Sequence, residues 1–271
     1  MIKSLTCFRK LRKMAKEGKY TVEKITYLKQ WTDHLFSFKT TRDSGFKFIP
    51  GQFARLGVKK EDDTFVWRPY SIVSADYDEE LEFYSIIVPD GEFTQRLKNL
   101  KVGDDIYIDK TNYGLLTTDR FENGKDLWFL STGTGLAPFI SIMYEFGIWE
   151  QYEKIILVHG VREVEELTYQ DEINSFFTHE YYGDLVKDKL IYVKVVSRET
   201  TGGDLYGRIT TLIENGELEK YVNIPLTIEN SRIMICGNPQ MVDDTRKILS
   251  AKGLTISKRA NPGNMAVENL W

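Results

Sequence analysis

The period of the hydrophobic pattern changes near residue 119, and this change constrains the fold more than any other feature of the chain. Upstream, short alternating or aromatic-rich runs are separated by turn residues, which is typical of an antiparallel barrel or sandwich. Downstream, near-continuous apolar runs alternate with segments of helical period, which is typical of parallel strands buried on both faces. The upstream runs are residues 35–40, 46–56, 65–73, 81–88 and 105–108, and the downstream runs are residues 127–130, 155–158, 190–196 and 233–236.

Two domains follow from this pattern and from the length of 271 residues. We expect an antiparallel β-domain over residues 20–118, interrupted by one helix at residues 93–100, and then an α/β domain with a parallel, Rossmann-like sheet over residues 119–271. Residues 1–19 are expected to be disordered or an extension. Six Lys or Arg residues and no acidic residue lie within the first sixteen positions, but the serine richness of a targeting signal is missing.

Composition excludes several classes of function. The net charge of -4 gives no basic footprint for a nucleic acid. Two cysteines and three histidines offer no spacing for a zinc site or an iron–sulfur cluster, so an organic cofactor would have to carry any electrons. No apolar run approaches the roughly 18 residues that a membrane span requires. Two distant thiols and no secretory signal favour the cytoplasm, and we expect a monomer.

The tetrapeptide Arg68-Pro69-Tyr70-Ser71 lies within the run 65–73. Residues two apart on a strand face the same way, so Arg68 and Tyr70 share one face. An arginine suits a diphosphate, a tyrosine ring suits a flat heterocycle, and Ser71 adds a short hydrogen bond. Taken alone, the tetrapeptide fits an ordinary strand with a surface arginine somewhat better than a binding site.

A glycine turn follows some twenty residues later, in the segment 88–94. Gly91 precedes Thr94 at the start of the expected helix 93–100. Free backbone N–H groups and a threonine hydroxyl at a helix start are suited to a pyrophosphate. A capped helix after a turn is the structural alternative, and only the arginine tetrapeptide upstream favours the binding site.

A second glycine loop, Gly133-Thr134-Gly135, directly follows the apolar run 127–130 and opens a helix. The glycines allow a phosphate or a nicotinamide to approach the backbone, and Pro138 fits the first helical turn. Because Pro138 replaces the third glycine of the dinucleotide fingerprint, the loop indicates a different nicotinamide fold.

The last motif, Cys236-Gly237-Asn238-Pro239, lies between the apolar run 233–235 and an expected helix over residues 240–249. Ligands of α/β proteins bind at the carboxyl ends of parallel strands, which is where this motif lies. A small buried cysteine followed by a plain turn is an equally good interpretation of the motif taken alone.

Taken together and in this order, these four motifs, with Val195 to Glu199 and Gly207-Arg208, resemble the ferredoxin-NADP⁺ reductase family, over roughly residues 20–271. The resemblance is closest to the bacterial type. It implies a six-stranded antiparallel FAD barrel followed by an NADP domain, with the flavin at the seam between them. It also implies an FAD-binding set consisting of Arg68, Pro69, Tyr70, Ser71, Gly91, Glu92, Phe93, Thr94, Thr134 and Trp271, the last stacked on a folded FAD.

For NADP(H), the resemblance implies that Arg162, Arg198 and Arg208 recognise the 2′-phosphate. Guanidinium groups satisfy its two negative charges better than the acidic residue of NAD enzymes does. Each arginine taken alone is more simply an exposed loop residue. The other residues implied for NADP are Thr134, Ser197, Cys236, Gly237, Asn238 and Asp243.

The implied activity is hydride transfer from NADPH to flavin N5, followed by electron delivery to a ferredoxin or flavodoxin. The residues implied near the reacting atoms are Tyr70, Ser71, Cys236 and Glu268. One alternative keeps the fold but serves free flavin or an oxygenase, and another is a non-catalytic flavoprotein subunit for electron transfer or sensing. The chain departs from the family at Leu270, where a related bacterial enzyme has an aromatic residue, and in an insertion near residues 177–188.

Overall fold

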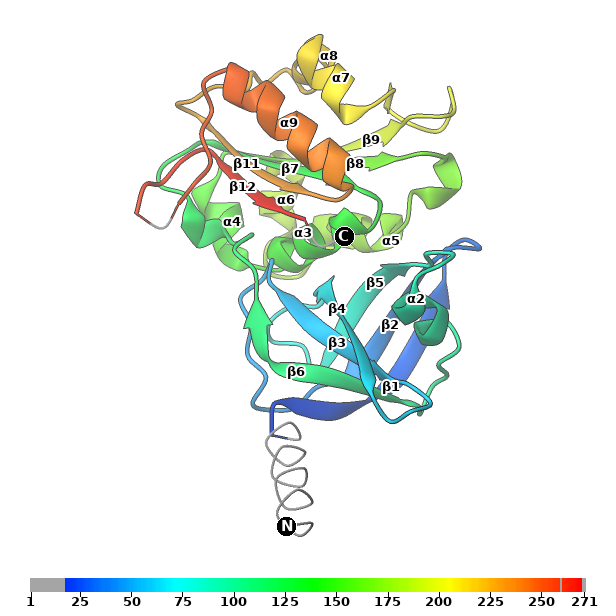
Figure 1. Ribbon diagram of the computed structural model, residues 1–271. Coiled ribbons are helices and arrows are strands. Elements are labelled where there is room, and N and C mark those ends of the chain that lie inside the picture. The colour runs from blue at the N-terminus through cyan, green and yellow to red at the C-terminus, as the bar shows by residue number, and fades with distance from the viewer. Residues whose placement is uncertain (1–17, 259, 270–271) are drawn as a thin grey trace.

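Six antiparallel strands close into a barrel in the first half of the chain (Figure 1). The computed structural model describes residues 18–258 and 260–269. The strand order in the barrel is β4-β3-β6-β1-β2-β5, and a bridge between Ile72 and Phe83 joins the β4 end of the sheet to β5. The strands are β1 (Tyr20–Gln30), β2 (Leu35–Thr41), β3 (Phe53–Lys59), β4 (Phe65–Ser71), β5 (Glu80–Ile86) and β6 (Asp105–Tyr113).

Aromatic and branched side chains fill the barrel. Phe38 and Phe83 are fully buried at its centre, with ring centroids 5.5 Å apart. The short helix α2 (Glu92–Leu97) adds Phe93 and Leu97 to the same core. Burial of these apolar surfaces stabilises the barrel, and it fixes the turn that precedes α2 against the end of β5.

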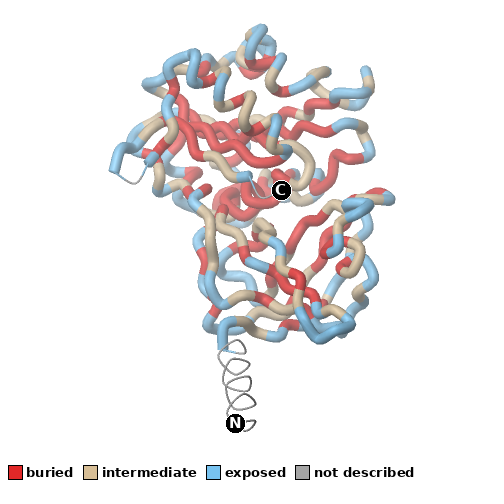
Figure 2. Tube along the Cα trace, viewed as in Figure 1, coloured by how far each residue is buried: buried red, intermediate tan, exposed pale blue. Residues whose placement is uncertain are grey.

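The second half forms a parallel sheet in the order β10-β9-β8-β7-β11-β12. Figure 2 shows that its strands are almost entirely buried. Alternate residues of β7 contribute to different cores, Leu127 and Phe129 to one face and Trp128 and Leu130 to the other. The strands are β7 (Asp126–Thr132), β8 (Lys154–Val161), β9 (Leu190–Val196), β10 (Leu205–Tyr206), β11 (Ser231–Cys236) and β12 (Met265–Glu268).

Helices cover both faces of this sheet, as the alternating apolar pattern requires. One group lies on the barrel side and the other on the far side (Figure 1). The barrel-side helices are α3 (Ala137–Met143), α4 (Phe146–Gln151), α5 (Gln170–Ser175) and α6 (Gly183–Lys189), and the far-side helices are α7 (Ile209–Glu214), α8 (Glu217–Val222) and α9 (Pro239–Ala251). Four 3-10 turns complete the described elements: η1 (Thr118–Arg120), η2 (Gly133–Leu136), η3 (Val164–Glu166) and η4 (Phe176–Thr178).

The two-domain fold predicted from the pattern is confirmed, with corrections at several boundaries. The run 46–56 is a strand only from Phe53 onward, because Pro50 and the left-handed Gly51 (φ 94°) interrupt extended backbone. Strand β6 extends beyond the expected run 105–108 to Tyr113, and the expected helix 93–100 ends at Leu97. Strands β1, β10 and β12 were not predicted. The boundary expected between residues 118 and 119 falls in η1 and stays a prediction.

Every helix within residues 18–258 and 260–269 is too short or too polar to span a lipid bilayer. The same described residues contain no cluster of three or more His, Cys, Asp or Glu side chains that could hold a metal ion.

The insertion near residues 177–188, to which the sequence assigns no function, packs an aromatic side chain into the α/β core. Tyr182 is only 4% exposed and stacks on Trp149 with ring centroids 6.1 Å apart. The rings of Phe176 and His179 also stack on the Tyr182 ring. Within the described residues, the buried Tyr182 hydroxyl has no hydrogen-bond partner. The insertion therefore contributes burial to the core, although one of its polar atoms is left unsatisfied.

We expect Tyr182→Ala to lower the free energy of unfolding by about 3 kcal/mol, because it leaves a large cavity beside Trp149. Tyr182→Phe keeps the ring and removes the unsatisfied hydroxyl, so it should be neutral or stabilising by about 1 kcal/mol. Tyr181→Ala is the matched control: Tyr181 is 79% exposed, and the change should stay within about 0.5 kcal/mol. Urea unfolding followed by tryptophan fluorescence measures all three. Equal losses for Tyr181→Ala and Tyr182→Ala would contradict the assignment.

Candidate functional site

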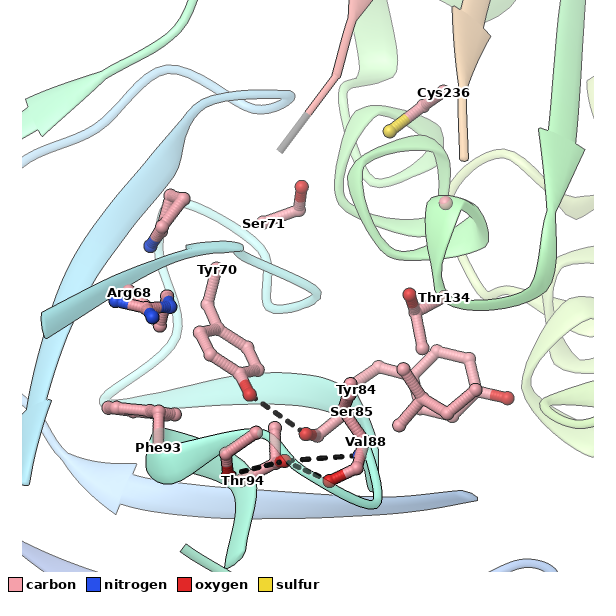
Figure 3. A pocket seen from close by; sticks show the side chains of 14 residues that line it. Arg68, Tyr70, Ser71, Tyr84, Ser85, Val88, Phe93, Thr94, Thr134 and Cys236 are labelled. Atoms are coloured by element: carbon pink, nitrogen blue, oxygen red, sulfur yellow. Dashed lines mark hydrogen bonds between the residues drawn. The ribbon is translucent and has the colours of Figure 1, made fainter. Parts of the chain in front are cut away.

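A cavity of about 370 Å³ opens at the seam between the barrel and the parallel sheet (Figure 3). Its barrel wall comes from β4, the end of β5 and the turn before α2. Its opposite wall comes from the loops at the carboxyl ends of β7 and β11. The lining residues are Arg68, Pro69, Tyr70, Ser71, Tyr84, Ser85, Ile86, Val88, Gly91, Phe93, Thr94, Thr134, Gly135 and Cys236.

Tyr70 presents its ring to the cavity and anchors its hydroxyl to β5. The Tyr70 hydroxyl lies 2.9 Å from the Ser85 hydroxyl, and its ring packs on Phe93 at a centroid distance of 5.4 Å. Burial raises the pKa of Tyr70 to about 12, so the phenol stays neutral. Arg68 is exposed, forms no ion pair within the described residues, and donates to the neighbouring Trp67 carbonyl at 2.8 Å. A rigid ring and an unpaired guanidinium thus lie along one strand.

The turn before α2 is held by a threonine hydroxyl. Thr94 Oγ1 accepts from the Val88 N–H at 3.1 Å and lies 3.3 Å from the Gly91 carbonyl, to which it can donate. The hydroxyl is therefore occupied in shaping the turn. Glu92, which was expected to bind FAD, is exposed and forms an ion pair with Lys60 at 3.4 Å instead of lining the cavity.

The opposite wall depends on a close approach of two backbone loops. A Cβ on Gly135 would clash with the carbonyl of Cys236, so only glycine lets the η2 turn pack against the end of β11. Gly237 adopts φ 139° beside Thr132, which also excludes a side chain. Asn238 caps α9, where its Oδ1 accepts from the Gln240 N–H at 3.0 Å. Its side-chain oxygen is thus committed to the helix.

Cys236 is buried where the two walls meet, facing Ser71 (Figure 3). Burial and the nearby Glu268 carboxylate raise the pKa of the Cys236 thiol far above its usual value, while a hydrogen bond with Ser71 opposes the shift. The thiol therefore stays protonated. Burial also raises the pKa of Glu268 to about 7, and within the described residues its buried Oε2 has no hydrogen-bond partner. Glu268 lies opposite Cys236 in the pairing of β12 with β11.

The three arginines expected at NADP all follow adjacent strands, at the carboxyl edge of the sheet. Arg162 follows β8, Arg198 follows β9 and Arg208 follows β10. Arg162 is already paired with Glu166 at 2.9 Å. Within the described part of the chain, Arg198 and Arg208 are exposed and form no ion pair. Ser197, at the same edge, donates its hydroxyl to the Val161 carbonyl at 3.1 Å.

Asp243 lies apart from the cavity, and Trp271 lies beyond the described chain. Asp243 is on α9 and pairs with Arg246 at 2.6 Å and with Lys247 at 2.5 Å, so its carboxylate is neutralised on the helix surface. Trp271, and Leu270 before it, lie outside the described residues, and the stacking of Trp271 on FAD stays a prediction.

Four barrel residues of the cavity wall were not predicted: Tyr84, Ser85, Ile86 and Val88. Tyr84, Ser85 and Ile86 come from the end of β5, which the sequence marks only as part of the apolar run 81–88, and Val88 opens the glycine-turn segment 88–94. The polar Ser85 within that run was the one available signal.

The comparisons with known proteins agree with this geometry. Residues 20–114 match the family described as "Oxidoreductase FAD-binding domain", and residues 129–247 match "Oxidoreductase NAD-binding domain". The fold and the seam cavity thus define an oxidoreductase of the class that binds FAD in one domain and a nicotinamide nucleotide in the other.

Particular relatives narrow the class. The chain is 45% identical to a ferredoxin–NADP reductase from Pseudomonas aeruginosa over 92% of its own length and 96% of the relative. It is 38% identical to a flavodoxin/ferredoxin–NADP reductase from Escherichia coli, over 92% of its own length and 97% of the relative. The crystal structure of a ferredoxin NADP⁺ reductase from Neisseria gonorrhoeae with bound FAD and NADP superposes with a TM-score of 0.86 at 36% identity, covering 93% of this chain and 99% of that one. The chain therefore belongs to the ferredoxin–NADP reductase family.

The cavity fits a flavin nucleotide on its own features. Tyr70 supplies a flat wall for a flat ring, and Arg68 is an available cation for a diphosphate. Thr134 and Ser71 add hydroxyl groups on facing walls. Glu268 does not line the cavity, but it is near enough to Cys236 to raise the pKa of the thiol.

We expect Glu268 to make the flavin-free protein less stable as pH rises from 4.5 to 7. The unfolded carboxyl ionises above its ordinary pKa of 4.5, whereas the folded one keeps its proton up to about pH 7. Stability is therefore lost with rising pH across this window and stays lower above it. Glu268→Gln cannot ionise, so its advantage over the natural protein should grow from near zero at pH 4.5 to about 1–3 kcal/mol at pH 8. Urea unfolding at several pH values measures the difference, and a pH-independent difference would contradict a buried, protonated Glu268.

Proposed function

We propose that this protein is an FAD-dependent reductase that transfers electrons between NADP(H) and a ferredoxin or flavodoxin. The observation that carries the proposal is the seam cavity, where Tyr70 and Ser71 of the barrel face Thr134 and Cys236 of the α/β domain. Such a site can hold a flavin ring against one wall and admit a nicotinamide from the other. The family membership supports the same activity.

On the flavin side, we assign the roles by the chemistry of the side chains. Arg68 binds the FAD diphosphate, Tyr70 stacks on the isoalloxazine, and Ser71 donates a hydrogen bond near N5. When bound, FAD supplies the conversion between a two-electron hydride and single electrons. The protein's residues orient the ring and exclude water from it. Pro69, Gly91, Phe93 and Thr94 complete the assigned flavin set.

On the nicotinamide side, Arg198 and Arg208 bind the 2′-phosphate, which is supported by their lack of ion pairs within the described residues. Thr134 and Cys236 flank the nicotinamide. The neutral thiol packs as a small side chain, since burial keeps it protonated. Glu268, with a pKa of about 7, is able to hold or release a proton beside it near neutral pH.

Two other functions are compatible with the same fold. A reductase of free flavin or of an oxygenase would keep the cavity and change the acceptor. A non-catalytic flavoprotein subunit would bind FAD without oxidising NADPH. We also propose that the protein acts as a monomer in the cytoplasm, in line with its two distant cysteines, and that it has no nucleic-acid partner, in line with its net charge of -4.

The purified chain should hold one non-covalent FAD and couple NADPH oxidation to the reduction of a ferredoxin or flavodoxin. Absorbance spectra give the flavin content, and the carrier proteins of the source organism serve as acceptors. NADPH oxidation with an artificial dye excludes the non-catalytic subunit. Fast dye or free-flavin reduction without reduction of any carrier protein would favour the flavin reductase instead. A protein that takes up no FAD would overturn the proposal.

Replacing both Arg198 and Arg208 by alanine should weaken NADPH binding far more than NADH binding. A hydrogen bond to a charged group contributes about 1.5–3 kcal/mol, so each lost contact predicts roughly a 10- to 150-fold effect on NADPH. NADH lacks the 2′-phosphate and should change little. Lys187→Ala is the control, because it removes a positive charge from α6, on the barrel-side face of the sheet and not at its carboxyl edge. Equal losses for NADPH and NADH would show that the two arginines do not recognise the phosphate.

A further inference from the structure

Glu166 carries a buried carboxylate that joins both domains. Its side chain is 7% exposed and lies at the end of η3. Oε2 accepts from the Arg162 backbone N–H at 2.8 Å, and Oε1 lies 2.9 Å from both Arg162 Nη2 and His34 Nε2. Burial raises the pKa of Glu166, but these donors together hold it below its usual value. A buried charge is costly unless it is paired, so the carboxylate and its donors hold each other in place.

On the barrel side, Glu166 connects to the wall of the cavity. His34 lies in the turn between β1 and β2, and its carbonyl accepts from the Ile87 N–H at 2.7 Å. Ile87 stands between two cavity-lining residues. Two residues beyond Glu166, the Thr168 hydroxyl donates to the Tyr84 hydroxyl at 2.8 Å, and Tyr84 also lines the cavity. The segment 162–168 is thus attached to the end of β5 at two points.

On the nucleotide side, the same segment is tied to the loop after β9. The Arg162 carbonyl accepts from the Arg198 N–H at 2.9 Å. Glu199 accepts from the Val164 N–H at 2.8 Å. Arg162 and Arg198 are therefore held at a fixed separation along the carboxyl edge of the sheet. The side chain of Arg162 remains 47% exposed, and Glu166 contacts one of its terminal nitrogens, so that further N–H donors have no partner among the described residues.

We propose that Glu166 is a positioning residue for the 2′-phosphate of NADP(H): it holds the Arg162 guanidinium at the edge of the sheet and ties that edge to the barrel through His34. The inference rests on the proposed function. An arginine loses rotamer freedom when it binds a phosphate, and a guanidinium that is already held loses less. The opposing effect, competition between the carboxylate and the phosphate for Arg162, is limited because the planar guanidinium serves both at once.

The test is calorimetric binding of adenosine 2′,5′-bisphosphate and of AMP to the FAD-loaded protein. These ligands differ by the 2′-phosphate and report on it without turnover. Glu166→Gln keeps the volume but cannot accept from all three donors, so it should weaken bisphosphate binding about tenfold, the lower end for a charge-assisted hydrogen bond. AMP binding should stay within about twofold of the unmodified protein. Glu165→Gln, the same change at the exposed neighbouring residue, should alter neither.

A double-mutant cycle distinguishes positioning from a general structural effect. If Glu166 acts through Arg162, then Glu166→Gln adds nothing to the loss already caused by Arg162→Ala. Additive losses would overturn the inference, as would tighter bisphosphate binding by Glu166→Gln, which would make the carboxylate a competitor. An unmodified protein that binds the bisphosphate no better than AMP would instead refute the proposed NADP(H) preference, and the inference with it.

His34→Ala, which leaves no side-chain donor for Glu166, provides a second variant should Glu166→Gln fail to fold. The His34 side chain is 35% exposed in a surface turn, so its replacement removes the tie to the barrel with less disturbance of the core. It should weaken bisphosphate binding about two- to threefold, and this effect should also vanish in the Arg162→Ala background. An unchanged bisphosphate affinity would overturn the inference that the contact between His34 and Glu166 helps to position Arg162.

Discussion

A hydrophobic core shared by both domains holds the barrel against the helices of the parallel sheet. Leu35, Val73 and Leu116 from the barrel and the connecting segment pack in one cluster with Phe139 and Ile142 of α3. Polar contacts cross the same seam. The Ser141 hydroxyl donates to the Ser74 carbonyl at 2.7 Å, and the Tyr169 hydroxyl donates to Glu82 at 2.7 Å. Because a large apolar interface restricts relative domain motion, this seam fixes the separation of the two cavity walls.

The arginines near the proposed nucleotide sites differ in whether an acidic side chain already pairs with them. Arg68, Arg198 and Arg208 have no ion-pair partner within residues 18–258 and 260–269, so they are available to phosphates. Arg162, in contrast, is held by a buried carboxylate that also reaches the barrel. Unpaired exposed guanidiniums cost little in water and gain strongly on meeting a dianion. A buried carboxylate, in contrast, is costly without partners even in the free protein. Glu166 therefore keeps its donors, and its position, before any nucleotide binds.

Local patterns in the sequence predicted the two domains and the face shared by Arg68 and Tyr70, because strand period and apolar runs are local properties. Strand β1 was missed because only Glu23 and Ile25 of its eleven residues are buried, which leaves almost no alternation to detect. The four residues of β12 are too short to show a period, and their parallel partner β11 lies on the other side of α9 in the sequence.

The roles of residues that depend on tertiary partners could not be predicted from the sequence. Asn238 and Asp243 lie in or beside a binding motif, but the start of α9 and two basic neighbours engage their side chains. Ser85 reaches the site only because the barrel brings β5 beside β4. A crystal structure of the protein with FAD tests directly whether the seam cavity is the flavin site. The isoalloxazine should lie in the seam cavity, between Tyr70 and the loop of Thr134. A flavin bound elsewhere would contradict the account.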